Sequence, residues 1–263
     1  MIPMTERFCI DLRAVPEMDL GEQMRLTKEA GFQNIHINSD AAFITKEQLH
    51  TYVQSAKEHG LHVVNLHPPF KRNCEFWVPG PQNDELTDLY LEQIDLCAAF
   101  GIESLIVHPT SGPDNVYISE LGLETCNRLV QHAEKRGVIL LLENLRTPVH
   151  LDYLFGNISS KNLQFCFDSG HENAYNRGIG FVRRYGPRMG FTHLHDNNGV
   201  DDQHHIPMDE SIDWAALRTD MEAVNYTGYL NLEIFPRPVN YDGSDYSAFV
   251  RRAFAALARI WGE

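Results

Sequence analysis

The sequence has little of what defines several common protein classes. Its five cysteines are an odd number with no CxxC pair, so neither a disulfide framework nor a thiolate zinc site is indicated. No apolar run is long enough to span a bilayer, and the first residues lack the apolar stretch of an export signal. Basic residues number 22 against 36 acidic ones, which argues against a nucleic-acid partner. We therefore expect a cytoplasmic, reduced protein without a membrane contact.

No linker or low-complexity stretch divides the 263 residues, and 43% of them are hydrophobic. That composition is sufficient for a full core and gives no sign of disorder. We therefore expect residues 1–263 to form a single domain.

Short apolar runs alternate with helical patterns along the chain. Their β-branched and aromatic content favours strands. The runs are 7–11, 34–38, 62–67, 103–108, 138–143, 163–168, 190–195 and 229–234. Between them, apolar residues repeat at helical spacing, as in 86–97, 214–224 and 249–260. Eight strands alternating with helices predict a parallel sheet closed into a (β/α)₈ barrel. An open doubly wound sheet is the alternative, but residues 12–16 (LRAVP) lack the glycine-rich turn that it would need.

Potential metal ligands stand at the ends of six of these eight runs. They are His67, His108, Glu143, Asp168, His193 with His195 and Asp196, and Glu233. One such residue alone is more often a solvated loop residue, but in a barrel all strand ends converge on one mouth. Two further clusters follow strands, His171 after Asp168 and Asp202-Gln-His204-His205. Imidazole and carboxylate ligands suit zinc, manganese, iron or cobalt, and bridging carboxylates allow several ions.

The stretches HPPFKRN, IVHP, LLEN, FDSGH, THLHDN, DQHH followed by IDW, and LEIF carry a family resemblance. Between His67 and Glu233 the chain resembles the xylose isomerase-like barrel superfamily, which includes sugar isomerases, ketose 3-epimerases, inosose dehydratases and endonuclease IV. The resemblance implies a four-residue metal core of Glu143, Asp168, His193 and Glu233, with His195 as the competitor of His193. Endonuclease IV-like members imply five more ligands, His67, His108, His171, Asp202 and His204. These two sets of ligands imply that each chain binds one to three zinc or manganese ions.

Departures from each pattern keep two enzymatic functions open. The Gly-x-Gly of endonuclease IV is replaced by 208–210 (MDE), and 196–202 is acidic where DNA would pass. The arginine that ketose 3-epimerases place six residues after the metal histidine is Gly199 here.

The first hypothesis is a divalent-metal-dependent isomerase, epimerase or dehydratase acting on a sugar or cyclic polyol, with Glu143 and Glu233 moving the proton. Candidate substrate contacts are Lys71, Arg72, Arg146, His195 and Arg237. The runner-up is a multi-zinc phosphodiesterase acting on abasic DNA, and a non-catalytic barrel that binds a partner is a third reading. The resemblance also implies a homo-oligomer.

Overall fold

The computed structural model describes residues 4–13, 15, 18–39, 41–112, 116–236 and 245–262. Its centre is an eight-stranded parallel sheet in the order β7-β6-β5-β4-β3-β2-β1-β8. The strands are β1 (Phe8–Leu12), β2 (Asn34–Asn38), β3 (His62–His67), β4 (Ser104–Val107), β5 (Ile139–Glu143), β6 (Leu163–Asp168), β7 (Met189–His193) and β8 (Leu230–Leu232). A parallel bridge between Leu194 and Leu232 joins β7 to β8. The predicted (β/α)₈ barrel is confirmed.

The last two strands are shorter than the sequence predicts. β7 ends at His193 and not at residue 195, because the backbone of Asp196 pairs with His205 of the following loop, N to O at 2.8 and 2.9 Å. β8 covers only Leu230–Leu232, which leaves Glu233 just beyond its end. The side chains that follow β7 therefore lie on a folded loop above the barrel.

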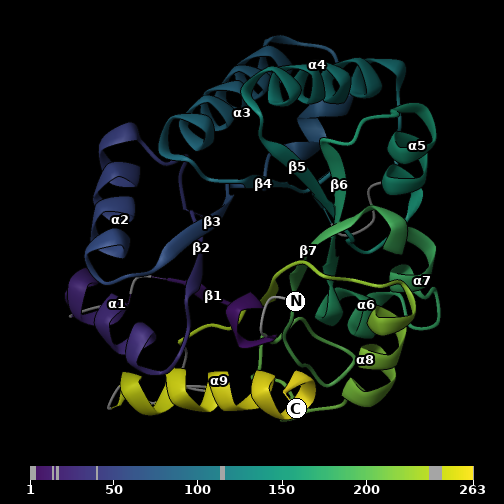
Figure 1. Cartoon of the computed structure of the whole chain (residues 1–263). Helices are drawn as coiled ribbons and strands as arrows, with labels where there is room; N and C mark the ends of the chain where they lie inside the picture. The colour runs from purple at the N-terminus through teal and green to yellow at the C-terminus, as the bar shows by residue number, and fades with distance from the viewer. Residues whose placement is uncertain are drawn as a thin grey trace.

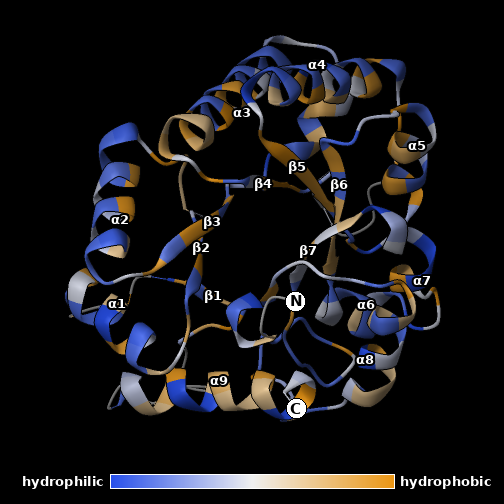
Figure 2. Ribbon diagram, viewed as in Figure 1, coloured by the Kyte–Doolittle hydropathy of each residue, from blue (hydrophilic) through white to orange (hydrophobic). Residues whose placement is uncertain are grey.

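Helices surround the barrel as an outer ring (Figure 1). They are α1 (Leu20–Glu29), α2 (Lys46–Glu58), α3 (Pro81–Phe100), α4 (Glu120–Arg136), α5 (Val149–Asn157), α6 (Ser169–Tyr175), α7 (Phe181–Tyr185), α8 (Trp214–Ala223) and α9 (Tyr246–Trp261), with short 3₁₀ helices at Met4–Arg7, Asn73–Trp77 and Gly186–Arg188. Hydrophobic colour dominates β5 and β6, whereas the outer helices alternate between hydrophobic and hydrophilic positions (Figure 2). Among the helices of the described residues, none is both long and apolar enough to cross a membrane.

Local chemistry sets where the helices begin and end. Thr45 and Gln48 form a capping box at the start of α2, which satisfies backbone N–H groups that have no helical partner. Gly101 and Gly137 end α3 and α4 with φ of 71° and 73°, a conformation that costs glycine little. Short turns then lead directly from α3 into β4 and from α4 into β5, so each strand starts close to the end of the helix before it.

A small apolar layer inside the barrel lies beneath the strand ends. It is separate from the main core between sheet and helices and consists of Cys9, Val64, Ile106, Leu141, Cys166 and Phe191. Because side chains alternate along a strand, the residue two positions further on points into the barrel as well. For β4 to β7 those residues are His108, Glu143, Asp168 and His193. The strand register therefore places four candidate ligands in one layer.

The packing of Trp77 against α4 gives a stability test. A Cβ added at Gly122 would overlap the Trp77 ring, which is 1% exposed and donates a hydrogen bond to the Pro109 carbonyl at 2.7 Å. We expect Gly122→Ala to lower the free energy of unfolding by about 1–3 kcal/mol, the usual cost of overpacking, in urea denaturation. Gly156→Ala is the control, because no atom lies within 4 Å of its added Cβ, and it should be neutral or stabilising. Equal effects of the two changes would contradict this packing.

Candidate metal centre at the mouth of the barrel

Four side chains meet at the C-terminal mouth of the barrel. Glu143, Asp168 and His193 end β5, β6 and β7, and Glu233 follows β8. One ligand atom from each lies within 4.8 Å of the others, and all four residues are buried. His193 Nδ1 lies 3.2 Å from Glu143 Oε2 and 3.4 Å from Glu233 Oε2. These separations are those of neighbouring ligands around a single ion of the kind that nitrogen and oxygen donors hold.

Polar atoms of this group lack hydrogen-bond partners. Within the described residues, Glu143 Oε2 and both ring nitrogens of His193 are buried without one. Buried polar groups are nearly always satisfied, and buried carboxylates are paired or bound to metal. The donor set and its unsatisfied atoms fit a divalent cation at this position.

A second group adjoins the first through Glu143. His67, His108 and Glu143 also lie within 4.8 Å of one another. His67 Nε2 is 3.2 Å from His108 Nε2, and His108 Nε2 is 3.1 Å from Glu143 Oε2. The Phe70 ring stacks on His108 with centroids 4.0 Å apart and holds the imidazole in place.

A third group forms around Asp202, on the loop after β7. Asp202 Oδ2 lies 3.4 Å from His171 Nε2 and 3.1 Å from His204 Nε2. His195 Nε2 lies 3.2 Å from Asp168 Oδ1 and 3.6 Å from Asp202 Oδ1. The structure thus brings together all nine residues of the extended ligand set as one continuous network.

Backbone carbonyls fix which nitrogen three of the histidines turn toward the network. Nδ1 of His67, His171 and His204 lies 2.9, 2.9 and 2.7 Å from the carbonyl oxygens of Pro68, Asn144 and Glu233. Each Nδ1 therefore carries the proton in the neutral ring, which leaves the Nε2 lone pair directed at the carboxylates. Outer hydrogen bonds of this kind are typical of metal-binding histidines.

The pKa values of Glu143 and Glu233 are shifted in opposite directions. Burial by itself raises the pKa of Glu143, but His108 and His193 outweigh it and hold that pKa well below its ordinary value. Burial raises the pKa of Glu233 well above its ordinary value, and the charges of Glu143 and Asp168 add to the effect. One carboxyl thus favours the charged form and the other the protonated form, the asymmetry of an acid–base pair.

The His195 ring is locked in place by the FDSGH stretch. Ser169 Oγ accepts a hydrogen bond from the His195 backbone N at 3.0 Å and donates one to its carbonyl at 2.8 Å. A Cβ at Gly170 would overlap the ring, so the close approach requires glycine. On its other face, His195 stacks on His204 with centroids 3.9 Å apart. His193 thus belongs to the central group and His195 to the Asp202 group.

Asp196 holds the loop that carries Asp202 and His204. Its buried carboxylate accepts hydrogen bonds from the backbone N–H groups of Asn197, Met208, Glu210 and Ile212 and from Trp214 Nε1, at 2.9–3.2 Å. The carboxylate therefore sets the position of ligands on this loop without belonging to the cluster.

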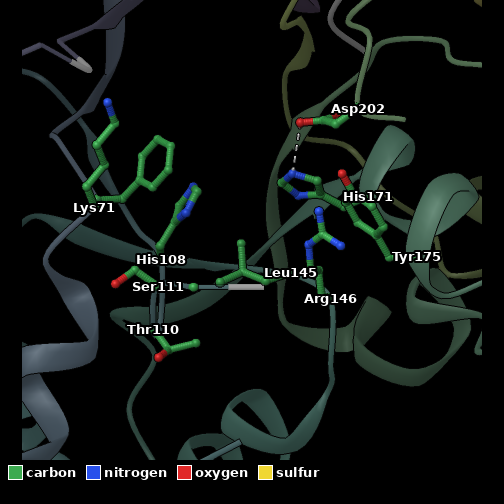
Figure 3. Close-up of a pocket in the computed structure, with 11 residues that line it drawn as sticks. Lys71, His108, Thr110, Ser111, Leu145, Arg146, His171, Tyr175 and Asp202 are labelled. Carbon is green, nitrogen blue, oxygen red and sulfur yellow. Dashed lines mark ion pairs between the residues drawn. The ribbon is translucent and has the colours of Figure 1, made fainter. Parts of the chain in front are cut away.

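The predicted substrate contacts separate into distinct places. Lys71 and Arg146 line a cavity of about 450 Å³ beside His108, His171 and Asp202 (Figure 3). Arg72 does not line it, because its guanidinium pairs with Glu75 at 2.9 Å and Glu85 at 3.2 Å. Arg237 lies outside the described residues.

Asn38 and Tyr175 at the mouth escape the sequence reasoning, whereas Arg13 is one of the basic residues that the sequence places there. Asn38 Nδ2 lies 3.3 Å from Glu233 Oε1, and Arg13 Nη2 lies 3.8 Å from the same oxygen. Tyr175 lines the cavity and stacks under the Arg146 guanidinium, 3.9 Å from the ring centroid. Asn38 ends β2, so the strand-end rule extended to neutral residues would find it. Tyr175, at the end of α6, carries no comparable signal.

Fold and centre together define a (β/α)₈ barrel with buried His, Asp and Glu groups suited to divalent metal. The model of the family described as xylose isomerase-like TIM barrel matches residues 24–250. The chain belongs to the xylose isomerase-like TIM barrel family, as the sequence resemblance predicts.

Known proteins similar to this chain agree with that assignment. An uncharacterized protein of Sinorhizobium fredii, y4fM, is 27% identical over 89% of this chain and 86% of its own length. D-psicose 3-epimerase of Clostridium cellulolyticum H10 superposes with a TM-score of 0.76 at 19% identity, over 96% of this chain and 97% of that one. A 3-keto-D-glucoside 4-epimerase of E. coli gives 0.75 at 18% identity, over 96% and 99%. At these identities the structural matches establish the shared fold.

Metal analysis tests the central group. Glu143→Gln and Asp168→Asn each remove a charged ligand, so we expect each to weaken binding of Mn²⁺ or Zn²⁺ at least about tenfold. Elemental analysis of protein purified without chelators, followed by titration of the chelated protein, measures this. Glu75→Gln, which changes a glutamate of the Arg72 ion pair, is the matched control and should retain full metal content. Full metal content in both ligand variants would contradict the assignment.

Proposed function

We propose that the protein is a divalent-metal-dependent isomerase, epimerase or dehydratase that moves a proton on a sugar or cyclic polyol. The observation that carries the proposal is the placement of Glu143 and Glu233. Both carboxylates reach His193 Nδ1, at 3.2 and 3.4 Å, yet they come from β5 and β8 on different sides of the barrel. A substrate above His193 would have one carboxylate at each side.

Glu143, Asp168, His193 and Glu233 would hold the cation. When bound, it supplies Lewis acidity toward adjacent hydroxyl and carbonyl oxygens and so makes the intervening C–H more acidic. Glu143 accepts the proton from this C–H group, and Glu233 returns a proton from the opposite side of the substrate. Return to the same carbon inverts its configuration, and return to the neighbouring carbon isomerises the sugar. Asn38, 3.3 Å from Glu233 Oε1, and Arg13 orient the second carboxylate.

The family supports a sugar substrate. The psicose and 3-keto-glucoside epimerases share the fold over nearly their whole length. The cavity beside the centre, about 450 Å³, is of a size suited to a small molecule.

A multi-zinc phosphodiesterase is the second candidate, favoured by the group of His67, His108 and Glu143. That group adjoins the central one, and two close cations sharing a carboxylate suit phosphodiester hydrolysis. Two or three zinc ions per chain, together with cleavage of an abasic-site duplex, would support this candidate over the first.

Carbon-bound proton exchange tests the first proposal. The metal-loaded protein is incubated in D₂O with a panel of ketoses, aldoses and inososes, and NMR detects deuterium next to the carbonyl. Glu143→Gln and Glu233→Gln should each reduce exchange by about 10²–10⁴-fold, the usual contribution of a general acid or base. Metal content is measured in the same samples, so that loss of the ion is separated from loss of the proton carrier.

Glu75→Gln should exchange at the rate of the unaltered protein. Absence of exchange over the whole panel with Mn²⁺, Co²⁺ and Zn²⁺ would overturn the proposal.

A further inference from the structure

Arg146 stands apart from most arginines in this acidic chain. Among the described arginines, only Arg146 and Arg259 have neither a hydrogen bond nor an ion pair, whereas others pair with carboxylates, as Arg128 does with Asp88 and Arg252 with Asp209. With 36 acidic residues against 22 basic ones, an arginine that borders a cavity without a carboxylate partner is unexpected. Its only described contact is the Tyr175 ring, with the guanidinium carbon 3.9 Å from the centroid. Stacking holds the guanidinium by its face and leaves its N–H edge free for a planar, charged group.

A second cation lines the same cavity. Lys71, on the loop after β3, has no hydrogen bond or ion pair within the described part of the chain. Figure 3 places Lys71 and His108 on one side of the cavity and Arg146, Tyr175 and His171 on the other, with Thr110 and Ser111 below them. The cavity thus has a cation on either side and the hydroxyl residues Thr110 and Ser111 in its lining.

Among the described residues that line this cavity, Asp202 alone carries a carboxylate. Asp202 belongs to the third group, 3.4 Å from His171 Nε2 and 3.1 Å from His204 Nε2, where its carboxylate would hold a cation of the centre. The remaining polar lining is rich in donors, and charged donors favour a ligand rich in acceptors. A neutral sugar can accept hydrogen bonds from both cations, but it brings no negative charge to meet theirs.

We propose that the substrate carries an anionic group, a phosphate or a carboxylate, which Lys71 and Arg146 bind in this cavity while the sugar carbons lie over the central group. The inference rests on the proposed function and names its substrate class. It differs from the neutral sugars, psicose and tagatose, named for the first structural neighbour.

Binding of three ligands with one carbon skeleton tests the inference. D-fructose, D-fructose 6-phosphate and D-fructuronate differ only at C6, and calorimetry with the metal-loaded protein gives their dissociation constants. We expect at least one anionic ligand to bind about tenfold or more tightly than D-fructose, a modest factor for charge-assisted hydrogen bonds. The better of the two identifies phosphate or carboxylate as the group recognised.

Side-chain changes separate the cavity from the metal as the source of that preference. Arg146→Gln and Lys71→Gln should each remove most of the preference, by weakening the anionic ligand more than D-fructose, and leave metal content unchanged. Arg259→Gln on α9 is the matched control, since it removes the other unpaired arginine far along the chain, and it should change nothing. Equal affinity for all three ligands, or a preference unaffected by Arg146→Gln, overturns the inference.

The same samples distinguish this failure from failure of the proposed function. Proton exchange on D-fructose without any anionic preference leaves the proposed function standing and removes the inference. An anionic preference that depends on Arg146, without exchange on any ligand, supports the anion site and counts against proton transfer.

Discussion

The concentration of carboxylates inside the barrel mouth is the constraint on which the rest of the structure depends. Glu143, Asp168 and Glu233 are 5% exposed or less and lie within one cluster, with Asp202 beside it. Negative charges this near to one another repel strongly in a low-dielectric interior unless a positive charge lies between them. Histidines surround the carboxylates, but Nδ1 of His67, His171 and His204 is directed at a backbone carbonyl, so in their neutral form these rings present an Nε2 lone pair and no proton to the acids. A divalent cation meets the requirement with the lone pairs that remain.

The barrel supplies the rigidity that this arrangement needs. Each ligand of the central group stands at or just beyond a strand end, and the apolar layer of Leu141, Cys166 and Phe191 lies beneath. The candidate ligands on the loop after β7 need more support, because a loop alone would not hold them against mutual repulsion. Asp196 gives that support with backbone hydrogen bonds, and the Ser169 and Gly170 contacts place His195 against Asp168. The short sequence motifs thus contain both candidate ligands and the residues that hold those candidates in position.

The alternation of strands and helices predicts the barrel from the sequence, and the strand ends predict which residues lie at its mouth. Both predictions succeed because they depend on local sequence patterns. His67, Glu143, Asp168 and Glu233 follow from the rule that parallel strands end on one face. Arg72 shows where that reasoning stops, since one position in the loop after β3 decides whether a cation faces the cavity or pairs with Glu75. The family resemblance favours His193 over His195, and the structure places His193 in the central group, before the chain turns into the loop in which Asp196 pairs with His205. Tyr175 depends on the packing of α6 against the loop of Arg146, a contact between segments that pattern alone does not connect.

Gly199 links the departure from the ketose 3-epimerase pattern to the cations of the cavity. Position 199 has φ of 77°, which side chains other than glycine rarely adopt, and a Cβ there would overlap the Arg177 guanidinium. Arg177 is in turn held by the carbonyl of Asn173, 2.9 Å from its Nε. The backbone conformation of the loop therefore disfavours an arginine at the place where that pattern has one. Positive charge at the mouth comes instead from Lys71 after β3 and Arg146 after β5, beside the His108 and His171 edge of the centre. The positive charge of this mouth therefore lies on a different side of the candidate centre from the position that the ketose 3-epimerase pattern marks.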